Sequence, residues 1–117
     1  MDLDIKRFDQ PDELRQFPLG TFEVIRIGDI TIGRASYEPG WRWSEHVGPI
    51  TGASSCKVSH AGLVLSGRAA VRMDDGHEFE MAAGDVFTVP GGHDSWVLGD
   101  EPYVSLHFLG ADDYAVE

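Results

Sequence analysis

The stretch Pro39-Gly40-Trp41-Arg42-Trp43-Ser44-Glu45-His46 is followed, fourteen residues after its histidine, by His60-Ala61-Gly62-Leu63-Val64-Leu65-Ser66-Gly67. Each stretch carries one histidine and is bounded by glycine or proline. This spacing predicts an antiparallel hairpin in which His46 and His60 face each other, with Cβ atoms about 5 Å apart. A third histidine, His93, follows a separate glycine-rich turn. Three imidazoles converging from distant positions predict a metal site.

Length and charge restrict the classes of protein to which this chain belongs. With 117 residues and 42% hydrophobic content, it has the size and composition of one globular domain. Its net charge of -11 argues against a nucleic-acid partner, which requires a basic surface. The same charge disfavours docking on an anionic membrane. A neutral or cationic small ligand is compatible with it.

Cysteine usage and the first residues predict a cytoplasmic protein. Cys56 is the one cysteine, so an intramolecular disulfide is excluded, as is usual in a reducing compartment. The segment that follows Met1 lacks the basic and apolar regions of a signal peptide. No run approaches the roughly 20 apolar residues of a membrane helix.

Short extended runs separated by glycine turns predict an all-β chain. The expected strands cover residues 22–27, 30–37, 41–47, 57–65, 69–73, 78–81, 86–89, 94–98 and 103–109. Residues 1–20 are expected to form an N-terminal arm that packs on the barrel, with one helical turn at Pro11–Arg15. Residues 21–117 then form a single β-barrel domain.

Two motifs within residues 37–98 resemble those of the cupin family. The first cupin motif is G(X)5HXH(X)3-4E(X)6G; here Gly40 precedes His46 by five residues, and His60 precedes Gly67 by six. The second is G(X)5PXG(X)2H(X)3N, and Gly84, Pro90 and His93 follow its order. The resemblance implies a double-stranded β-helix, or jelly roll.

The sequence departs from both motifs in its metal-ligand positions. Gly48 stands at the second histidine of the first motif, and His60 replaces the glutamate. His93 comes two residues early in the second motif. The resemblance therefore implies a reduced ligand set of His46, His60 and His93. Such a set would suit a divalent ion, zinc, iron(II) or nickel, and loss of the metal is the alternative.

Other residues are candidates for a pocket around the metal. They are Arg42, Trp43, Cys56, Phe87, Trp96 and His107. The aromatic members either wall a ligand pocket or fill the barrel core and a subunit interface. Cys56 is either a thiolate ligand or a small buried side chain, and we expect the second. His107 either reaches the cavity or faces solvent, and we expect it to face solvent.

These observations leave two classes of function open. One is a metal-dependent enzyme acting on a small molecule, such as a three-histidine oxygenase or an isomerase. The other is a non-catalytic module that binds or senses a small molecule. The sequence identifies no general acid or base, and the fold alone does not decide between the classes. The resemblance also implies a homodimer, often formed by adding an N-terminal strand to the partner's sheet.

Overall fold

A computed structural model describes residues 3–116, which form nine strands and two short helices. In chain order these are β1 (Glu13–Phe17), β2 (Gly20–Ile27), β3 (Ile30–Tyr37), α1 (Trp43–His46), α2 (Gly48–Thr51), β4 (His60–Ser66), β5 (Arg68–Met73), β6 (Glu78–Ala82), β7 (Val86–Val89), β8 (His93–Leu98) and β9 (Tyr103–Leu109). The predicted all-β class is confirmed. Each described helix has four residues, too few for the roughly 20 that cross a bilayer.

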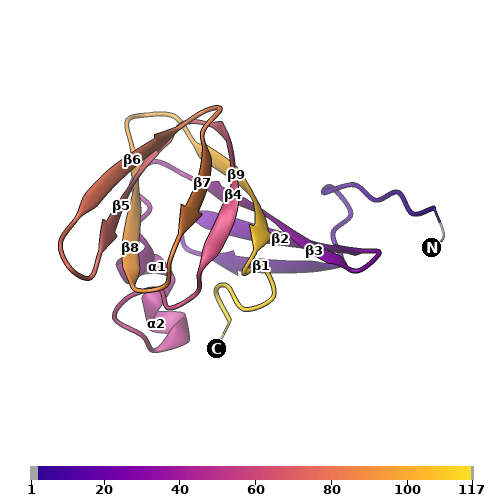
Figure 1. Cartoon of the computed structure of the whole chain (residues 1–117), viewed down its shortest axis with the longest axis horizontal. Helices are drawn as coiled ribbons and strands as arrows, with labels where there is room; N and C mark the ends of the chain where they lie inside the picture. The colour runs from indigo at the N-terminus through magenta and orange to yellow at the C-terminus, as the bar shows by residue number, and fades with distance from the viewer. Residues whose placement is uncertain (1–2, 117) are drawn as a thin grey trace.

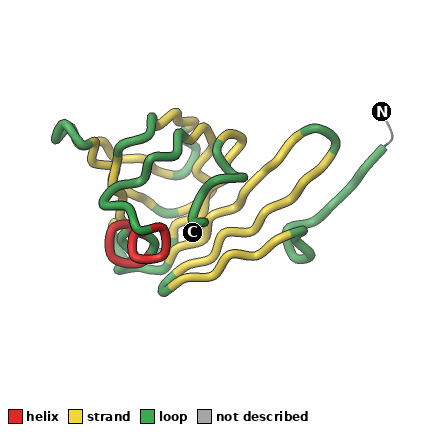
Figure 2. Tube along the Cα trace, turned by 90° about the horizontal axis from the view of Figure 1, so that it is seen from below, coloured by secondary structure: helices red, strands yellow, loops and turns green. Residues whose placement is uncertain are grey.

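The strands form two antiparallel sheets that face each other (Figure 1). The larger sheet has the order β1-β2-β3-β9-β4-β7, and the smaller has the order β6-β5-β8. β6 and β7 are consecutive in the chain, yet they are edge strands of different sheets. The hairpin of β2 and β3 projects away from the smaller sheet as an open ribbon (Figure 2).

Aromatic rings fill much of the space between the sheets. Tyr37 stacks on Trp41 with ring centroids 3.7 Å apart and ring planes only 4° from parallel. Phe22 on β2 and Trp43 on α1 are also buried. Aromatic side chains remove a large apolar area from water, so this cluster contributes much of the hydrophobic stabilisation. It also leaves little free volume inside the barrel.

Two glycines make room for a histidine on the inner face of the larger sheet. Gly33 on β3 and Gly62 on β4 both lie opposite His107 on β9. A Cβ atom at Gly62 would overlap the Leu106 carbonyl, and one at Gly33 would overlap the Phe22 ring. The missing side chain at Gly62 lets β4 approach β9 closely. The missing side chain at Gly33 leaves space for the Phe22 ring, which packs on His107.

The strand and hairpin predicted for residues 41–47 are wrong, because the chain forms α1 and α2 there. The carboxylate of Asp94 on β8 accepts hydrogen bonds from the Ser44 backbone N–H at 3.0 Å and from its hydroxyl at 2.8 Å. A carboxylate at the first turn satisfies N–H groups that have no partner within the helix. His46 therefore ends a helix instead of facing His60 across a hairpin.

The helical turn predicted at Pro11–Arg15 is also wrong, because β1 occupies this region. Along β1 the buried residues Arg15 and Phe17 alternate with exposed ones such as Leu14. Every β1 residue pairs with β2, and this hairpin pairing overrides a weak local helix signal. The predicted boundary after residue 20 falls inside this hairpin, just after the first residue of β2.

Candidate metal centre

Three potential metal ligands meet inside the barrel: Cys56, His60 and His93. Their ligand atoms all lie within 4.8 Å of one another, and each side chain is buried. The Cys56 Sγ atom is 3.5 Å from Nε2 of His60. A backbone contact holds the group together, since the Cys56 N–H donates to the His93 carbonyl at 2.7 Å. His60 and His93 are the first residues of β4 and β8.

His107 on β9 lies directly against this group. Its ring centroid is 5.0 Å from that of His60, and the two rings are nearly perpendicular at 87°. Its Nε2 atom is 3.0 Å from the Ser105 hydroxyl. The expectation that His107 faces solvent is wrong, because alternation along β9 directs it to the inner face between Gly33 and Gly62.

Burial keeps these side chains uncharged at neutral pH. It lowers the pKa of His60 to about 2, and the neighbouring His107 and His93 add to this shift. Burial, followed by the effect of His93, lowers the pKa of His107 to about 4. Burial also lowers the pKa of His93 and raises the pKa of the Cys56 thiol to about 11. The imidazoles therefore offer free lone pairs, whereas the thiol keeps its proton until a cation displaces it.

Two imidazole nitrogens of the cluster lack a hydrogen-bond partner, namely Nδ1 of His60 and Nδ1 of His107. A buried polar atom without a partner costs about 1–3 kcal/mol. In His60 the other ring nitrogen, Nε2, faces Cys56 and is the one that a cation among the three side chains would meet. In His93, Nδ1 lies 2.7 Å from the Pro90 carbonyl, so Nδ1 donates and Nε2 keeps its lone pair. Metal-ligating histidines are commonly oriented in this way.

The cavity beside the cluster measures about 40 Å³ and is walled by Trp41, Trp43, Tyr103 and Tyr114, among others. One water occupies about 10–15 Å³ by the same measure, so the cavity suits an ion with one or two small ligands. Pockets for drug-sized molecules measure about 300–1,000 Å³. Among the described residues, no carboxylate lines the cavity. The aromatic rings thus fill the core beside the histidines.

The predicted pocket residues lie in three different places. The cavity is lined by Trp43, Phe87 and His107. Cys56 belongs to the ligand cluster. Arg42 and Trp96 lie outside the cavity lining: the Arg42 guanidinium lies over the Trp96 ring at 4.2 Å and pairs with Asp94 at 3.2 Å. These two side chains fasten α1 to β8.

Solved structures show which known fold this geometry shares. No family model matches the sequence, and no curated protein matches it. A protein of unknown function from Rhizobium leguminosarum superposes with a TM-score of 0.65 at 20% identity, over 92% of this chain and 95% of that one. A Klebsiella pneumoniae protein with a double-stranded β-helix domain superposes with a TM-score of 0.59 at 17% identity, over 93% and 85%.

The chain has the double-stranded β-helix fold. The predicted double-stranded β-helix is thereby confirmed. A mutant of Bacillus subtilis oxalate decarboxylase also superposes, with a TM-score of 0.59 at 24% identity, over 88% of this chain. The chain spans only 29% of the length of that enzyme, and the similarity concerns the fold.

The cupin motif also explains how Cys56 joins the site. A histidine precedes the motif's glutamate by three or four intervening residues, and His60 stands at the glutamate position. Three residues separate Cys56 from His60, as the motif requires, whereas Gly48 is too far away. His46 is half-exposed on α1, with its Nδ1 3.0 Å from the Arg42 backbone nitrogen. The structure groups Cys56, not His46, with the other two ligands.

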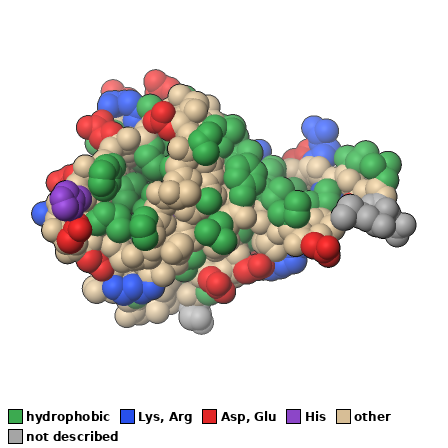
Figure 3. Space-filling model, in the orientation of Figure 1, with side chains coloured by type: hydrophobic (Ala, Val, Ile, Leu, Met, Phe, Trp, Pro, Cys, Tyr) green, Lys and Arg blue, Asp and Glu red, His purple; other side chains and the backbone are tan. Residues whose placement is uncertain are grey.

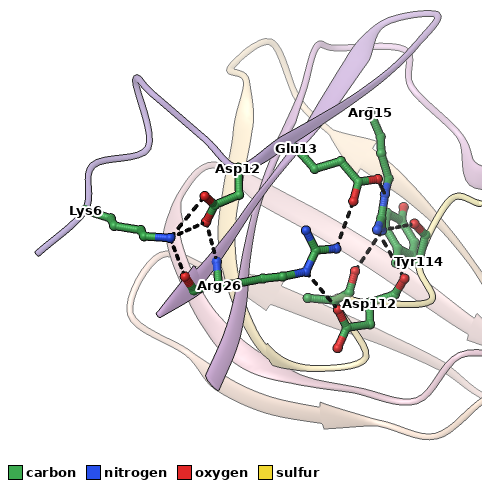
Figure 4. A network of polar contacts seen from close by, with 8 residues as sticks. Lys6, Asp12, Glu13, Arg15, Arg26, Asp112 and Tyr114 are labelled. Atoms are coloured by element: carbon green, nitrogen blue, oxygen red, sulfur yellow. Dashed lines mark hydrogen bonds and ion pairs between the residues drawn. The ribbon is translucent and has the colours of Figure 1, made fainter. Parts of the chain in front are cut away.

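The C-terminal segment closes the site in a way that the sequence did not reveal. The Tyr114 ring lies 5.1 Å from that of His60, between centroids, and its hydroxyl is 2.6 Å from the Tyr37 hydroxyl. Arg15, which is 9% exposed, donates hydrogen bonds to three backbone carbonyls of residues 111–114 (Figure 4). The edge strand β1 thus holds the segment that covers the histidines.

Proposed function

We propose that this protein binds one divalent metal ion through Cys56, His60 and His93. The observation that carries the proposal is the buried convergence of one thiol and two imidazoles within 4.8 Å. His107 lies close enough to support this site, because its ring contacts that of His60. His60 faces Cys56 through its Nε2 atom, 3.5 Å from Sγ, so this nitrogen is the one placed to coordinate the ion.

The chemistry of the donors restricts the identity of the metal. One thiolate and two imidazoles suit zinc, iron(II) or nickel, whereas magnesium and calcium prefer oxygen ligands. The Cys56 thiol, whose pKa is raised to about 11, becomes a thiolate when the metal displaces its proton. Three protein ligands leave at least one coordination position for a small exogenous ligand.

The size of the cavity bears on what the metal does. About 40 Å³ beside the cluster accommodates water or a diatomic molecule, not an organic substrate. This volume favours the non-catalytic role, in which the metal stabilises the barrel or senses a small ligand. An oxygenase or isomerase acting on an organic molecule would need a substrate site outside this cavity.

Metal analysis of matched histidine variants tests the proposal. Protein is loaded separately with zinc, iron(II) or nickel, desalted and analysed for metal content. We expect about one ion per chain for wild type and for His46→Gln. His60→Gln and Cys56→Ser should retain less metal after desalting, because their affinity for the ion falls at least about tenfold. Retention of metal by His60→Gln, or its loss from His46→Gln, would overturn this assignment.

We also propose that the protein forms a homodimer through the edge of β1. β1 is the terminal strand of the larger sheet, and Leu14 on it is 49% exposed. Leu3 and Ile5, in the arm ahead of it, are 89% and 78% exposed. An uncovered strand edge with apolar side chains favours pairing with a second chain. Light scattering should show a dimer that Leu14→Lys dissociates, and a monomeric wild type would contradict the proposal.

A further inference from the structure

A second, larger cavity lies between β6 and β7, outside the ligand cluster. The two strands are joined by the short turn at residues 83–85, but β6 pairs with β5 and β7 pairs with β4. Between their edges is a cleft of about 480 Å³, lined mainly by apolar side chains of β5, β6 and β7. Hydrophobic side chains gather on this face of the molecule (Figure 3). Its volume lies within the range of about 300–1,000 Å³ for small-molecule sites.

The walls of the cleft include an inward-facing aromatic ring that the protein leaves uncovered. Phe79 on β6 lies opposite Val71, a residue that is only 3% exposed. Phe79 is nevertheless 57% exposed, because no strand covers that side of β6. Met73 and Pro90 complete the apolar surface around it. A ligand in the cleft would therefore bury this ring without any rearrangement of the sheets.

The floor of the cleft is also a wall of the ligand cluster. Val71, Met81, Phe87 and Val89 line both the cleft and the inner cavity. The Phe87 ring lies 5.7 Å from that of His107, between centroids. One layer of side chains thus separates the cleft from the histidines, and it includes a flexible methionine.

Charge selects among apolar ligands. Asp75 and His77 stand at the rim, with their carboxylate oxygen and Nδ1 3.0 Å apart, and no lysine or arginine of the described chain lines the cleft. The sequence carries a net charge of -11. An anion entering the cleft would therefore meet repulsion, whereas a neutral molecule or a cation would not.

We propose that this cleft binds an apolar small molecule that is neutral or carries one positive charge. The ligand lies between β6 and β7, with Phe79 against its apolar body and Asp75 near its polar end. The site does not require the metal, since none of its walls is contributed by Cys56, His60 or His93. Where the metal is present, one layer of side chains would separate it from the ligand. The cleft would then offer a site for an organic substrate that the inner cavity excludes.

Two fluorescent probes with one skeleton test the proposal on metal-free protein. N-phenyl-1-naphthylamine is neutral, and 8-anilinonaphthalene-1-sulfonate adds one negative charge to the same rings. We expect saturable binding of the neutral probe and binding of the anionic probe that is at least about tenfold weaker. Phe79→Gln should weaken binding of the neutral probe at least about tenfold. Phe108→Gln is the matched control, because Phe108 is also exposed, at 50%, but does not line the cleft.

Each outcome decides for or against the cleft. Selective loss in Phe79→Gln, with Phe108→Gln within about twofold of wild type, supports it. Absence of saturable binding, equal losses in the two variants, or preference for the anionic probe would overturn it. Asp75→Asn should reduce the preference between the probes, and an unchanged preference contradicts the electrostatic part. Because metal is left out, failure here leaves the metal-content experiment intact, and failure of that experiment leaves this one intact.

Discussion

Acidification should destabilise the metal-free protein well above the pH at which carboxylates are protonated. The pKa values of His60 and His107 fall from the usual 6.5 to about 2 and about 4 on folding, mainly because both rings are buried. Between pH 6.5 and pH 5 the unfolded chain takes up protons at these two positions, but the folded protein does not. Protons then favour the unfolded state, so stability is fully present above pH 6.5 and declines as the pH falls.

The magnitude follows from the size of the two shifts. One histidine that is protonated only when unfolded costs about 1.4 kcal/mol per pH unit below 6.5. From pH 7 to pH 5 this is about 2 kcal/mol for each ring and about 4 kcal/mol for both, compared with a typical total of about 5–15 kcal/mol. Glu13, whose pKa is lowered from 4.5 to about 2, loses its contribution only at lower pH.

Urea denaturation followed by tryptophan fluorescence at pH 7, 6 and 5 measures this effect. We expect the loss between pH 7 and pH 5 to be smaller by about 2 kcal/mol in His107→Gln, whatever the absolute stability of that variant. His77→Gln is the control, because the His77 side chain is 75% exposed in the folded protein. A wild-type free energy of unfolding that does not change over this range, or equal pH dependence in all three proteins, would refute the reasoning.

Three further predictions concern the thiol and the C-terminal closure. Zinc binding at pH 7 should release about one proton per ion, because the Cys56 thiol with its pKa of about 11 must ionise. Calorimetry in two buffers measures the number of protons released, and Cys56→Ser should release none. Tyr114→Phe should lower the free energy of unfolding by about 1–3 kcal/mol, because the buried Tyr37 hydroxyl loses its partner, and the double phenylalanine variant should recover part of this loss. Arg15→Met should lower the free energy of unfolding by about 3 kcal/mol or more, because three backbone carbonyls lose their donor. Arg7→Met, at an exposed position, should change it by less than about 0.5 kcal/mol.

The results that would contradict these predictions are equally specific. Proton release that persists in Cys56→Ser would exclude the thiol as its source. If the double phenylalanine variant loses as much stability again relative to Tyr114→Phe, the two tyrosine hydroxyls are not coupled. Equal effects of Arg15→Met and Arg7→Met in urea denaturation would mean that the buried guanidinium does not hold the C-terminal segment.

Part of the candidate site follows from local sequence patterns. His60 and His93 were predicted as ligands from their place in the cupin motifs, and the structure brings both into one cluster. Counted forward from its first glycine, Gly40, the first cupin motif leads to His46. Aligned from Gly67 backwards, the same spacing reaches Cys56. Cys56 is therefore readable from the sequence as a candidate ligand, although the long segment between His46 and His60 obscures this spacing.

The all-β class is readable from the sequence, because alternating side chains and glycine turns favour strands over most of the chain, although residues 41–47 are an exception. Which side chains meet depends on contacts between distant parts of the chain. Asp94 binds the first turn of the helix around Ser44 from 50 residues away, and His46, at the end of that helix, lies outside the ligand cluster. His107 is buried because glycines on both neighbouring strands lie opposite it. Local alternation specifies the face on which a residue lies, whereas long-range strand pairing specifies what covers that face.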